Sequence, residues 1–403
     1  MRIGVDIRVL MDKNYSGISE YTANLLAEIK KQSEALKERE LENKLEASLI
    51  NKPDEYKLFY NSYHNIEDRL GAWRSDNFSI ISTRLPNKIF NYLLEKIFSY
   101  PKLDKVLGGV DLFWSPHFNF SSFSKNKDFK KIITVHDLSF LRYPEFFSWR
   151  KNFWHKALNV KKIIREADLI ITVSLNTKND IVELLNINPE KIKVIYSGNN
   201  LVKREITALE KEESLKRFNL SGPFILYLGN IEPRKNIKGL IESYNNLRKK
   251  NPNLADLKLV LAGGKGWKSK EIFKSYKKSK YKKDIYFLGY ISKSDKEILY
   301  ASAKVFVYPS YYEGFGFPVL EAMAYGCPVI CSNVSSLPEI VADAAITINP
   351  YNNEEIETAL ELFLSDEKLR ELFIAKGYER EKLFTWKNTA EKYIEEFKKY
   401  DKK

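Results

Sequence analysis

The chain has 403 residues, more than a single hydrophobic core usually organises, so two domains are expected. Hydrophobic residues make up 44% of the sequence, which excludes a disordered chain, and no apolar run approaches the roughly 20 residues of a membrane-spanning helix. The net charge of +13 indicates an anionic partner, for which nucleic acid, anionic lipid and a phosphorylated substrate all qualify.

The first residues and the cysteines bear on where the chain resides. An acid, Asp6, stands where a secretory signal would continue its apolar core. Cys327 and Cys331 lie close together in an apolar segment, so we predict reduced core residues rather than a disulfide framework, with half of a zinc site as the alternative. A cytoplasmic protein is therefore expected.

Residues 1–198 alternate short apolar runs with amphipathic stretches, as the strands and crossover helices of a parallel sheet do. The stretch 32–56 interrupts this pattern, and because it is highly charged and poor in aromatic residues we predict an extended helix and a mobile loop there. The expected strands are residues 3–9, 57–60, 111–114, 131–135, 169–173 and 193–196.

Two residues of this half are candidates for a ligand site. Gly17 follows the first expected strand and leaves the backbone free to approach a ligand closely. His136 directly follows a later strand, at the carboxyl edge where parallel sheets bind ligands, although a lone histidine there is more often a structural hydrogen bonder. The other three histidines show no partner spacing, so neither a role nor a metal site is predicted for them. They are His64, His117 and His155.

A predicted helix at residues 88–98 is apolar along most of its length, with cations at intervals. Such a helix could lie on an anionic membrane at the inner face, where each basic residue adds roughly 1 kcal/mol of attraction. It could equally pack into the core of its domain. Helical spacing alone does not separate these two interpretations, and both stay open.

The charged segment 199–222 separates the first series of strands from a second and is predicted as the linker. The second domain is expected over residues 223–385, and a last helix, residues 386–403, is expected to begin after an N-cap at Thr385 and to pack back on the first domain. Two parallel sheets joined by a hinge place a ligand in the cleft between them. The expected strands are residues 224–228, 257–262, 285–288, 305–308 and 329–331.

The segment 308–321 is the most informative part of the sequence. It follows a strand and opens a helix, and Gly314 and Gly316 allow unusual torsions beside a ligand, where free amides favour an anion such as a diphosphate. Because the turn reverses the chain, Glu313 and Glu321 can point into one pocket and accept hydrogen bonds from sugar hydroxyls. A solvated loop charge at Glu313 and a helix-dipole role for Glu321 are the alternatives.

A second loop, residues 228–236, follows the first strand of this domain and contains two adjacent cations. Sheet topology puts ligand phosphates at such a strand-to-helix turn. Arg234 can grip a phosphate through its fork, and Lys235 offers a compact charge. A solvated surface turn is the alternative, because Arg-Lys pairs are common on surfaces.

Two weaker signals lie between these loops. Residues 262–266 are rich in glycine but lack the full spacing of a dinucleotide loop, and we predict a turn without a role. Residues 265–283 hold nine lysines with aromatic residues interspersed, which we interpret as a solvated helical face.

Together these motifs resemble glycosyltransferase family 4. Glu313 and Glu321 are similar to its signature of two glutamates separated by seven residues, Arg234-Lys235-Asn236 to its basic pair, and residues 332–339 to its next loop, as in bacterial mannosyltransferases of surface polysaccharide assembly. The resemblance implies an α/β protein of the GT-B fold, with two Rossmann-like parallel-sheet domains facing each other across a cleft. The first would bind the acceptor and the second the nucleotide sugar donor.

The same resemblance implies roles for the residues of the donor domain. Glu313 would contact the donor sugar and Glu321 the ribose, while Arg234 and Lys235 would hold the diphosphate. Leu337 would line the nucleotide side. The backbone after the first glutamate would bind the sugar and diphosphate, at Gly314, Phe315, Gly316 and Phe317.

In the first domain the resemblance places His136 beside the transferred sugar, as a neutral donor and acceptor of hydrogen bonds. Gly17 would lie close to the donor or the acceptor. Ser19 and Glu20 stand where many members of the family carry a glycine and a basic residue, so direct phosphate contact is not expected there.

By resemblance the protein is a retaining hexosyltransferase that needs no metal and no cofactor besides its co-substrate, the nucleotide diphosphate sugar. The acceptor would be a glycan or a lipid-linked molecule. Mannose from GDP-mannose is favoured, with a UDP-sugar as the alternative. Another enzyme on the same fold, such as a nucleotide-sugar epimerase or a phosphorylase, is a second alternative. A nucleic-acid-binding protein is not favoured, because the aromatic residues are not arranged as stacking platforms.

Overall fold

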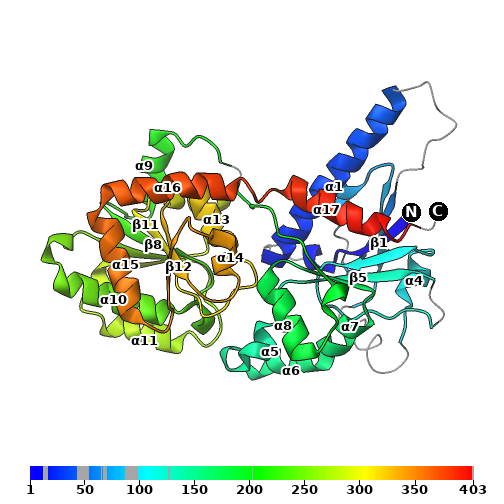
Figure 1. Cartoon of the computed structure of the whole chain (residues 1–403), viewed down its shortest axis with the longest axis horizontal. Helices are drawn as coiled ribbons and strands as arrows, with labels where there is room; N and C mark the ends of the chain where they lie inside the picture. Colours follow the sequence, from blue (N-terminus) through cyan, green and yellow to red (C-terminus); the bar gives the residue numbers. More distant parts are fainter. Residues whose placement is uncertain are drawn as a thin grey trace.

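A computed structural model shows two parallel β-sheets, each flanked by helices, in two domains that lie next to each other along the long axis of the molecule (Figure 1). It describes residues 1–11, 17–42, 54–64, 66, 70–86, 99–125, 128–201 and 203–401, and for residues 37–42 the backbone alone.

The first domain contains a seven-stranded sheet in the order β3-β2-β1-β4-β5-β6-β7, and all neighbouring strands are parallel. The sequence pattern does not predict β3, because its serines and threonine lie among half-buried residues at the edge of the sheet and weaken the apolar signal. The strands are β1 (Arg2–Asp6), β2 (Glu55–Asn61), β3 (Phe78–Thr83), β4 (Leu112–Ser115), β5 (Lys130–Val135), β6 (Leu169–Thr172) and β7 (Ile192–Val194).

The second domain contains a six-stranded parallel sheet in the order β10-β9-β8-β11-β12-β13. The strand order reverses between β8 and β11, and a parallel sheet binds ligands in the crevice at such a reversal. The short edge strand β13 also escapes the sequence pattern. The strands are β8 (Phe224–Leu228), β9 (Lys258–Ala262), β10 (Ile285–Gly289), β11 (Val305–Tyr308), β12 (Val329–Ser332) and β13 (Ile346–Ile348).

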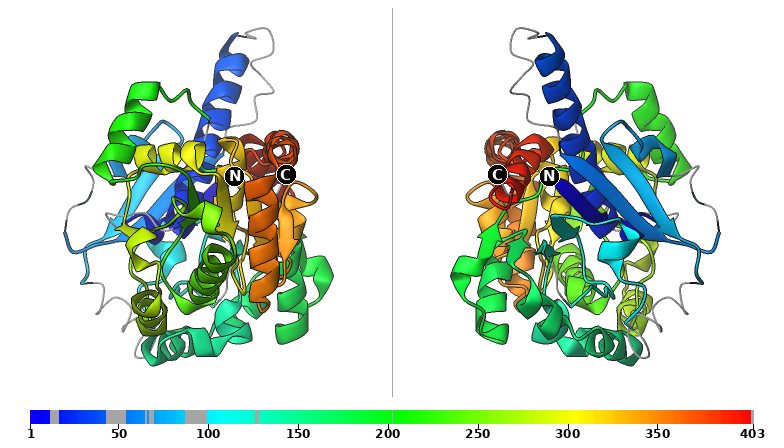
Figure 2. Two further views of the ribbon diagram at one scale, coloured as in Figure 1. Left: turned by 90° about the vertical axis from the view of Figure 1, so that its left-hand side faces the viewer. Right: turned by 90° about the vertical axis from the view of Figure 1, so that its right-hand side faces the viewer.

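Helices form the crossovers and cover the faces of both sheets (Figures 1 and 2). In the first domain they are α1 (Gly17–Glu42), α4 (Leu103–Val106), α5 (Ser139–Arg142), α6 (Trp149–Leu158), α7 (Val160–Glu166) and α8 (Leu175–Leu185). From the linker onward they are α9 (Ala208–Arg217), α10 (Ile237–Lys250), α11 (Lys270–Lys278), α12 (Lys293–Ser302), α13 (Phe317–Ala324), α14 (Leu337–Val341), α15 (Asn353–Ser365), α16 (Glu367–Glu381) and α17 (Trp386–Lys398).

Two segments of the chain connect the domains and touch each other. The Asn199 amide donates to the carbonyl of Phe384 at 2.9 Å. Gly198 passes so close to the second segment that a Cβ there would lie 2.3 Å from the Trp386 nitrogen. These close contacts fix the place where the chain crosses from one domain to the other and back.

The segment 199–222 is only partly a linker, which corrects the prediction. It contains α9, which packs against α12 of the second domain, and Ser214 Oγ donates to Asp295 at 2.9 Å. A capping box between Thr207 and Glu210 starts this helix. Its many charges conceal the helix in the sequence, because they suggest a solvated connection.

The last helix, α17, crosses back and packs against α1 of the first domain, as Figure 1 shows. Thr385 caps it by accepting from the amide of Asn388 at 3.2 Å, which confirms the predicted N-cap. Tyr393 is fully buried there, and its hydroxyl bonds the hydroxyls of Tyr21 at 2.6 Å and Thr134 at 2.7 Å. Helix α17 is thus part of the core of the first domain.

Three further predictions concern the cysteines, the charged and apolar stretches of the first domain, and membrane-spanning helices. Both cysteines are buried and free, as predicted. The expected helix within 32–56 is present as α1 up to Glu42, and residues 43–53 and the whole segment 88–98 lie outside the described residues. Within the described part of the chain, no helix is both long and apolar enough to span a bilayer.

Candidate functional site

A buried ion cluster lies where β8 and β11 end side by side. Arg234 and Lys235 belong to a short 3-10 helix, η7 (Pro233–Lys235), after β8, and Glu313 lies in the turn after β11. Lys235 Nζ donates to Glu313 Oε1 at 2.5 Å, and Arg234 Nη1 lies 3.3 Å from Glu313 Oε2. The three side chains that sequence reasoning assigned to donor sugar and diphosphate therefore meet in one place.

The electrostatics of this cluster keep Glu313 ionised. Burial by itself would raise the pKa of the Glu313 carboxyl, but the Lys235 ammonium and the Arg234 guanidinium outweigh it and lower the pKa to about 2. Arg234 also donates to Glu232 Oε1 at 3.0 Å and to the Tyr312 carbonyl at 2.5 Å. Its fork is thus aligned before any anion arrives.

The glycine turn after Glu313 is held against both domains. Gly314 lies so close to the first domain that a Cβ would be 2.2 Å from the His136 carbonyl oxygen. Gly316 has φ of +108° and stands at the N-cap of α13, a conformation that favours glycine. Ser336 Oγ donates to the carbonyls of Glu313 and Phe315 at 3.0 and 2.9 Å, and these bonds hold the turn in place.

The side chains of Phe315 and Phe317 point away from the ion cluster, toward the domain connection. Phe315 is buried against Phe384, with ring centroids 5.9 Å apart, and Phe317 lies 6.4 Å from the Trp386 ring. Any contact of these two residues with a donor therefore involves their backbone.

Leu337 is also a core residue. It is fully buried at the start of α14, and its Cδ2 lies 2.6 Å from where a Cβ of Gly316 would stand. Its side chain packs beneath the glycine turn, so the predicted place of Leu337 on the nucleotide side stays a prediction for its backbone. Glu339 of the same loop instead accepts from the amides of Leu175 and Asn176 at 2.8 and 2.9 Å, which joins the second domain to the first.

Glu321 does not join the Glu313 cluster, which corrects the prediction of one shared pocket. It is buried and accepts from Lys296 Nζ at 2.8 Å and from the Tyr300 hydroxyl at 3.0 Å. Lys296 and Tyr300 lie four residues apart on α12, so they share a face. Glu321 lies in the second turn of α13, and this carries its carboxyl toward α12.

A pocket of about 350 Å³ lies next to Lys296. Lys296, Lys293 and Tyr290 line it from the second domain, and Glu20 from α1 of the first. Gly263 and Gly264 line it as well, so the glycine-rich turn to which sequence reasoning gave no role borders a cavity. Glu321 contacts Lys296, which lines this pocket, so the pocket is a second polar site besides the ion cluster.

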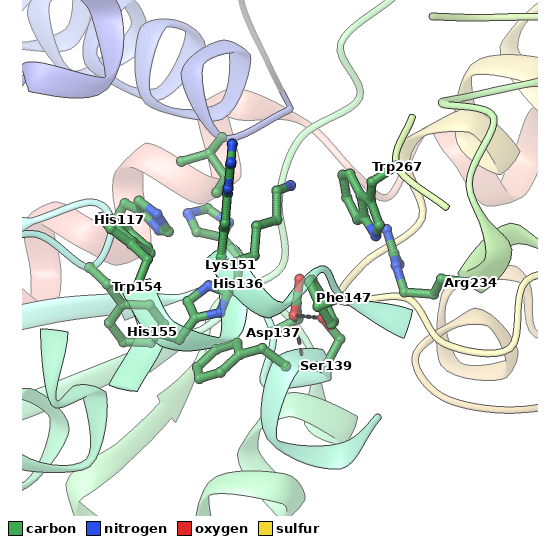
Figure 3. A pocket seen from close by; sticks show the side chains of 14 residues that line it. His117, His136, Asp137, Ser139, Phe147, Lys151, Trp154, His155, Arg234 and Trp267 are labelled. Atoms are coloured by element: carbon green, nitrogen blue, oxygen red, sulfur yellow. Dashed lines mark hydrogen bonds between the residues drawn. The ribbon is translucent and has the colours of Figure 1, made fainter. Parts of the chain in front are cut away.

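A larger pocket of about 460 Å³ lies between the domains (Figure 3). Arg234 and Trp267 enter it from the second domain, opposite His136 and Asp137. His136 Nε2 bonds the Pro116 carbonyl at 2.9 Å, and burial lowers the pKa of His136 below its ordinary value, so the ring is neutral. The predicted position of His136 at the interdomain cleft is thus the observed one.

Several pocket residues are not predicted by the sequence. His117 and His155 line the same cavity, and burial lowers the pKa of His117 to about 3. His117 stands two residues after β4, beside β5, so the carboxyl-edge argument that selects His136 could also have found His117. Trp267 belongs to the lysine-rich stretch interpreted as a solvated face, and no local signal sets it apart.

Gly17 is the first residue of α1, so the glycine does not sit in a loop. Residues 12–16 before it lie outside the described residues. A Cβ at Gly17 would have no neighbour within 4 Å, and Ile18 next to it lines the interdomain pocket. Gly17 therefore lies next to a residue of the interdomain pocket, and its close approach to a ligand stays a prediction.

Two family models and several known proteins match the sequence of this chain. The family described as Glycosyl transferases group 1 matches residues 210–380, and Glycosyltransferase Family 4 matches residues 63–202. O-antigen chain mannosyltransferase B of Escherichia coli is 34% identical over 278 residues, which cover 67% of this chain and 70% of that protein. The serotype-specific mannosyltransferase WbdA of Escherichia coli is 31% identical over 68% of this chain, which spans about a third (34%) of WbdA.

Solved structures show the same architecture. HepE of Anabaena, in complex with UDP and glucose, matches with a TM-score of 0.71 at 16% identity, covering 99% of this chain and 100% of that one. WaaG, a glycosyltransferase involved in lipopolysaccharide biosynthesis, matches with a TM-score of 0.63 at 13% identity, covering 98% and 99%. The predicted GT-B fold is therefore confirmed. With the matching family descriptions and the identity to a mannosyltransferase over two thirds of both chains, the chain belongs to glycosyltransferase family 4.

Proposed function

We propose that this glycosyltransferase moves a mannosyl residue from GDP-mannose to a glycan or lipid-linked acceptor in the synthesis of a cell-surface polysaccharide, with retention of anomeric configuration. The observation that carries the proposal is the buried cluster of Glu313, Arg234 and Lys235 beside the interdomain pocket. It combines a sugar-hydroxyl acceptor with two cations at the strand ends where parallel sheets bind phosphates.

The two cations suit the leaving group. In the proposed reaction the bond between the anomeric carbon and the diphosphate oxygen breaks, and the acceptor oxygen bonds that carbon from the same face. The acceptor proton passes to the departing diphosphate. Arg234 and Lys235 would stabilise the growing negative charge, which is the task a divalent metal performs elsewhere, so we propose a metal-independent reaction.

The residues around the reacting carbon act by positioning. Glu313 stays ionised and offers a fixed acceptor for a donor hydroxyl, while neutral His136 opposite donates through Nε2 to Pro116 and offers Nδ1 as an acceptor without adding charge. The open side of the interdomain pocket, bordered by Trp154 and Arg150 of α6, is assigned to the acceptor.

The nucleoside is assigned to the second pocket. Glu321 would accept from a ribose hydroxyl, exchanging one of its bonds to Lys296 or Tyr300. Tyr290, Asn230 and Ser292 line the same 350 Å³ cavity and offer an aromatic ring and polar groups to a base. The distance between this cavity and the ion cluster would be spanned by the diphosphate.

The choice of donor rests on the relatives. The two mannosyltransferases that resemble this chain support mannose. HepE, however, has been solved with UDP-glucose, so a UDP-sugar remains the second candidate.

A thermal-shift comparison of GDP, UDP and ADP with their sugars tests the donor. A ligand at 100 times its Kd adds roughly 2.7 kcal/mol of stability, so GDP and GDP-mannose should raise the midpoint and the other nucleotides should not. The NMR coupling at the anomeric carbon of the product tests retention, and activity in EDTA tests metal independence. Conversion of the donor without any acceptor would instead identify an epimerase.

Because the acceptor of such a reaction is assembled on lipid, we infer that the protein acts on the cytoplasmic side of a membrane. The proposed donor is a charged nucleotide sugar, and the proposed acceptor is bound to a bilayer. The enzyme therefore has to bring its interdomain pocket to the membrane surface.

A further inference from the structure

Helix α6 exposes an unusual amount of aromatic surface. Of its ten residues only Leu158 is buried. Trp149 and Phe153 lie four residues apart, on one face of the helix, and are 75% and 65% exposed. Trp154 beside them is 41% exposed and lines the interdomain pocket. Neighbouring large aromatic side chains that face solvent on one element mark an interaction surface.

The stretch of chain that carries these rings has cations and no acid until Glu166, at the end of α7, which lies 3.7 Å from Lys162. Between Phe146 and Arg165 the chain carries no Asp or Glu. The cations of this stretch are Arg150, Lys151, Lys156, Lys161, Lys162 and Arg165. Aromatic rings beside cations that outnumber the nearby carboxylates fit a surface that is apolar inside and anionic outside. A neutral glycan could stack on the rings, but it would make no use of the cations.

A second basic element points the same way. Helix α11 of the second domain lies on the same side of the molecule as α6, the lower side in Figure 1. Lys270, Lys274 and Lys277 of α11 line an open groove together with Phe273. The loop before α11 touches the first domain, since Lys151 Nζ lies 3.3 Å from the centroid of the Trp267 ring. Basic elements of both domains therefore lie on the same side of the molecule, and Trp267 before α11 lines the interdomain pocket.

We propose that α6, α7 and α11 form a docking surface for an anionic lipid bilayer. Trp149 and Phe153 insert among the headgroups, and the lysines contact the lipid phosphates. The inference deepens the proposed function, because it would bring the pocket bordered by Trp154 to a lipid-linked acceptor. Vesicle binding needs neither donor nor acceptor, so it can fail or succeed independently of the proposed reaction.

Co-sedimentation with vesicles of phosphatidylcholine alone, or of phosphatidylcholine mixed with anionic phosphatidylglycerol, tests the surface. The full chain should bind the anionic vesicles and leave them at high salt. Lys161→Glu with Lys162→Glu should weaken partitioning by at least about 30-fold, and Trp149→Ser with Phe153→Ser by about tenfold.

Controls lie on α9, which is on the opposite, upper side of the molecule in Figure 1. Leu209 is 64% exposed, and Lys216 lies on the same helix. Leu209→Ser and Lys216→Glu should bind vesicles like the unchanged chain, and thermal melting should show all variants folded. The proposal is overturned if the α6–α7 variants bind like the controls, or if the unchanged chain ignores phosphatidylglycerol. Loss of binding to immobilised acceptor glycan with vesicle binding intact would identify a glycan platform instead.

Discussion

At the scale of single residues, the charge of Glu313 and the burial of its neighbours determine how the site behaves. The carboxyl pairs with Lys235 and shares Arg234 with Glu232, so it offsets the cost of burying these two cations. In return the cations keep the carboxyl ionised. A donor that places its diphosphate on Arg234 and Lys235 would compete with Glu313 for them and free the carboxyl to accept from the sugar.

The first prediction concerns Lys235. Lys235→Ala should lower kcat/KM by about 10- to 150-fold, because one charged hydrogen bond of roughly 1.5–3 kcal/mol is lost in the transition state. Steady-state kinetics with the donor identified by thermal shift provide the measurement. Lys238→Ala, an exposed lysine on the adjoining helix α10, is the control and should leave kcat/KM unchanged. Equal effects of both changes would remove Lys235 from the site.

The second prediction concerns Glu313 and pH. The pKa of Glu313 is lowered from 4.5 to about 2, so the unfolded chain takes up a proton at a higher pH than the folded chain does. The stabilisation by this carboxyl is therefore complete above pH 4.5 and is lost as pH falls toward 2. Glu313→Gln should flatten the dependence of unfolding free energy on pH in this window, as urea titrations at several pH values would show.

The same substitution separates the sugar from the nucleotide. Glu313→Gln should reduce turnover while retaining or raising the affinity for the free nucleotide, since Glu321 and its pocket are untouched and the carboxylate that competes for Arg234 and Lys235 is gone. Calorimetric titration with the nucleotide measures this. Loss of nucleotide binding with normal turnover at saturation would contradict the assignment of Glu313 to the sugar.

At the scale of elements, the loops after β5, β8 and β11 bring the two domains together. The turn before α13 approaches the end of β5 so closely that only a residue without a side chain fits at position 314. The glycine therefore serves the contact between domains as well as the ligand. Sequence reasoning gave only the second explanation, because the first requires the position of the other sheet.

The third prediction follows from this contact. Gly314→Ala would place a Cβ 2.2 Å from the His136 carbonyl oxygen, so the domains cannot close to the observed distance. We expect at least about a tenfold loss of kcat, since small misplacements of reacting groups are costly, with nucleotide binding retained by the second domain. Gly71→Ala is the control, because a Cβ there meets nothing within 4 Å. Normal turnover in Gly314→Ala would show that the contact is not needed for the reaction.

At the scale of the whole molecule, the C-terminal helix α17 packs against the N-terminal helix α1. Helix α17 leaves the second domain and completes the core of the first, so the first domain depends on a segment from the far end of the sequence. The network of Tyr393, Tyr21 and Thr134 joins α17, α1 and β5 beneath the pocket that contains His136. The C-terminal helix therefore supports the first-domain side of the cleft, which we propose binds the acceptor.

The fourth prediction tests this support. Tyr393→Ala should destabilise the chain by about 3–5 kcal/mol, because a fully buried aromatic ring and two hydrogen bonds are lost. Urea unfolding measures the change, and Tyr63→Ala, at a side chain that is 66% exposed, is the control. A cost of Tyr393→Ala close to that of the control would mean that α17 adds little to the core.

The sequence by itself determined the two series of parallel strands, the capped last helix and the association of Glu313 with Arg234 and Lys235. These follow from local patterns, namely alternating apolar runs, capping residues and motifs at strand ends, and parallel topology brings strand ends together. Only the tertiary structure decided that Glu321 turns to Lys296, that Leu337 and Phe315 belong to the core, and that His117 and Trp267 enter the pocket. Those outcomes depend on which distant elements pack against each residue. The local sequence around a residue does not determine which parts of the chain become its neighbours.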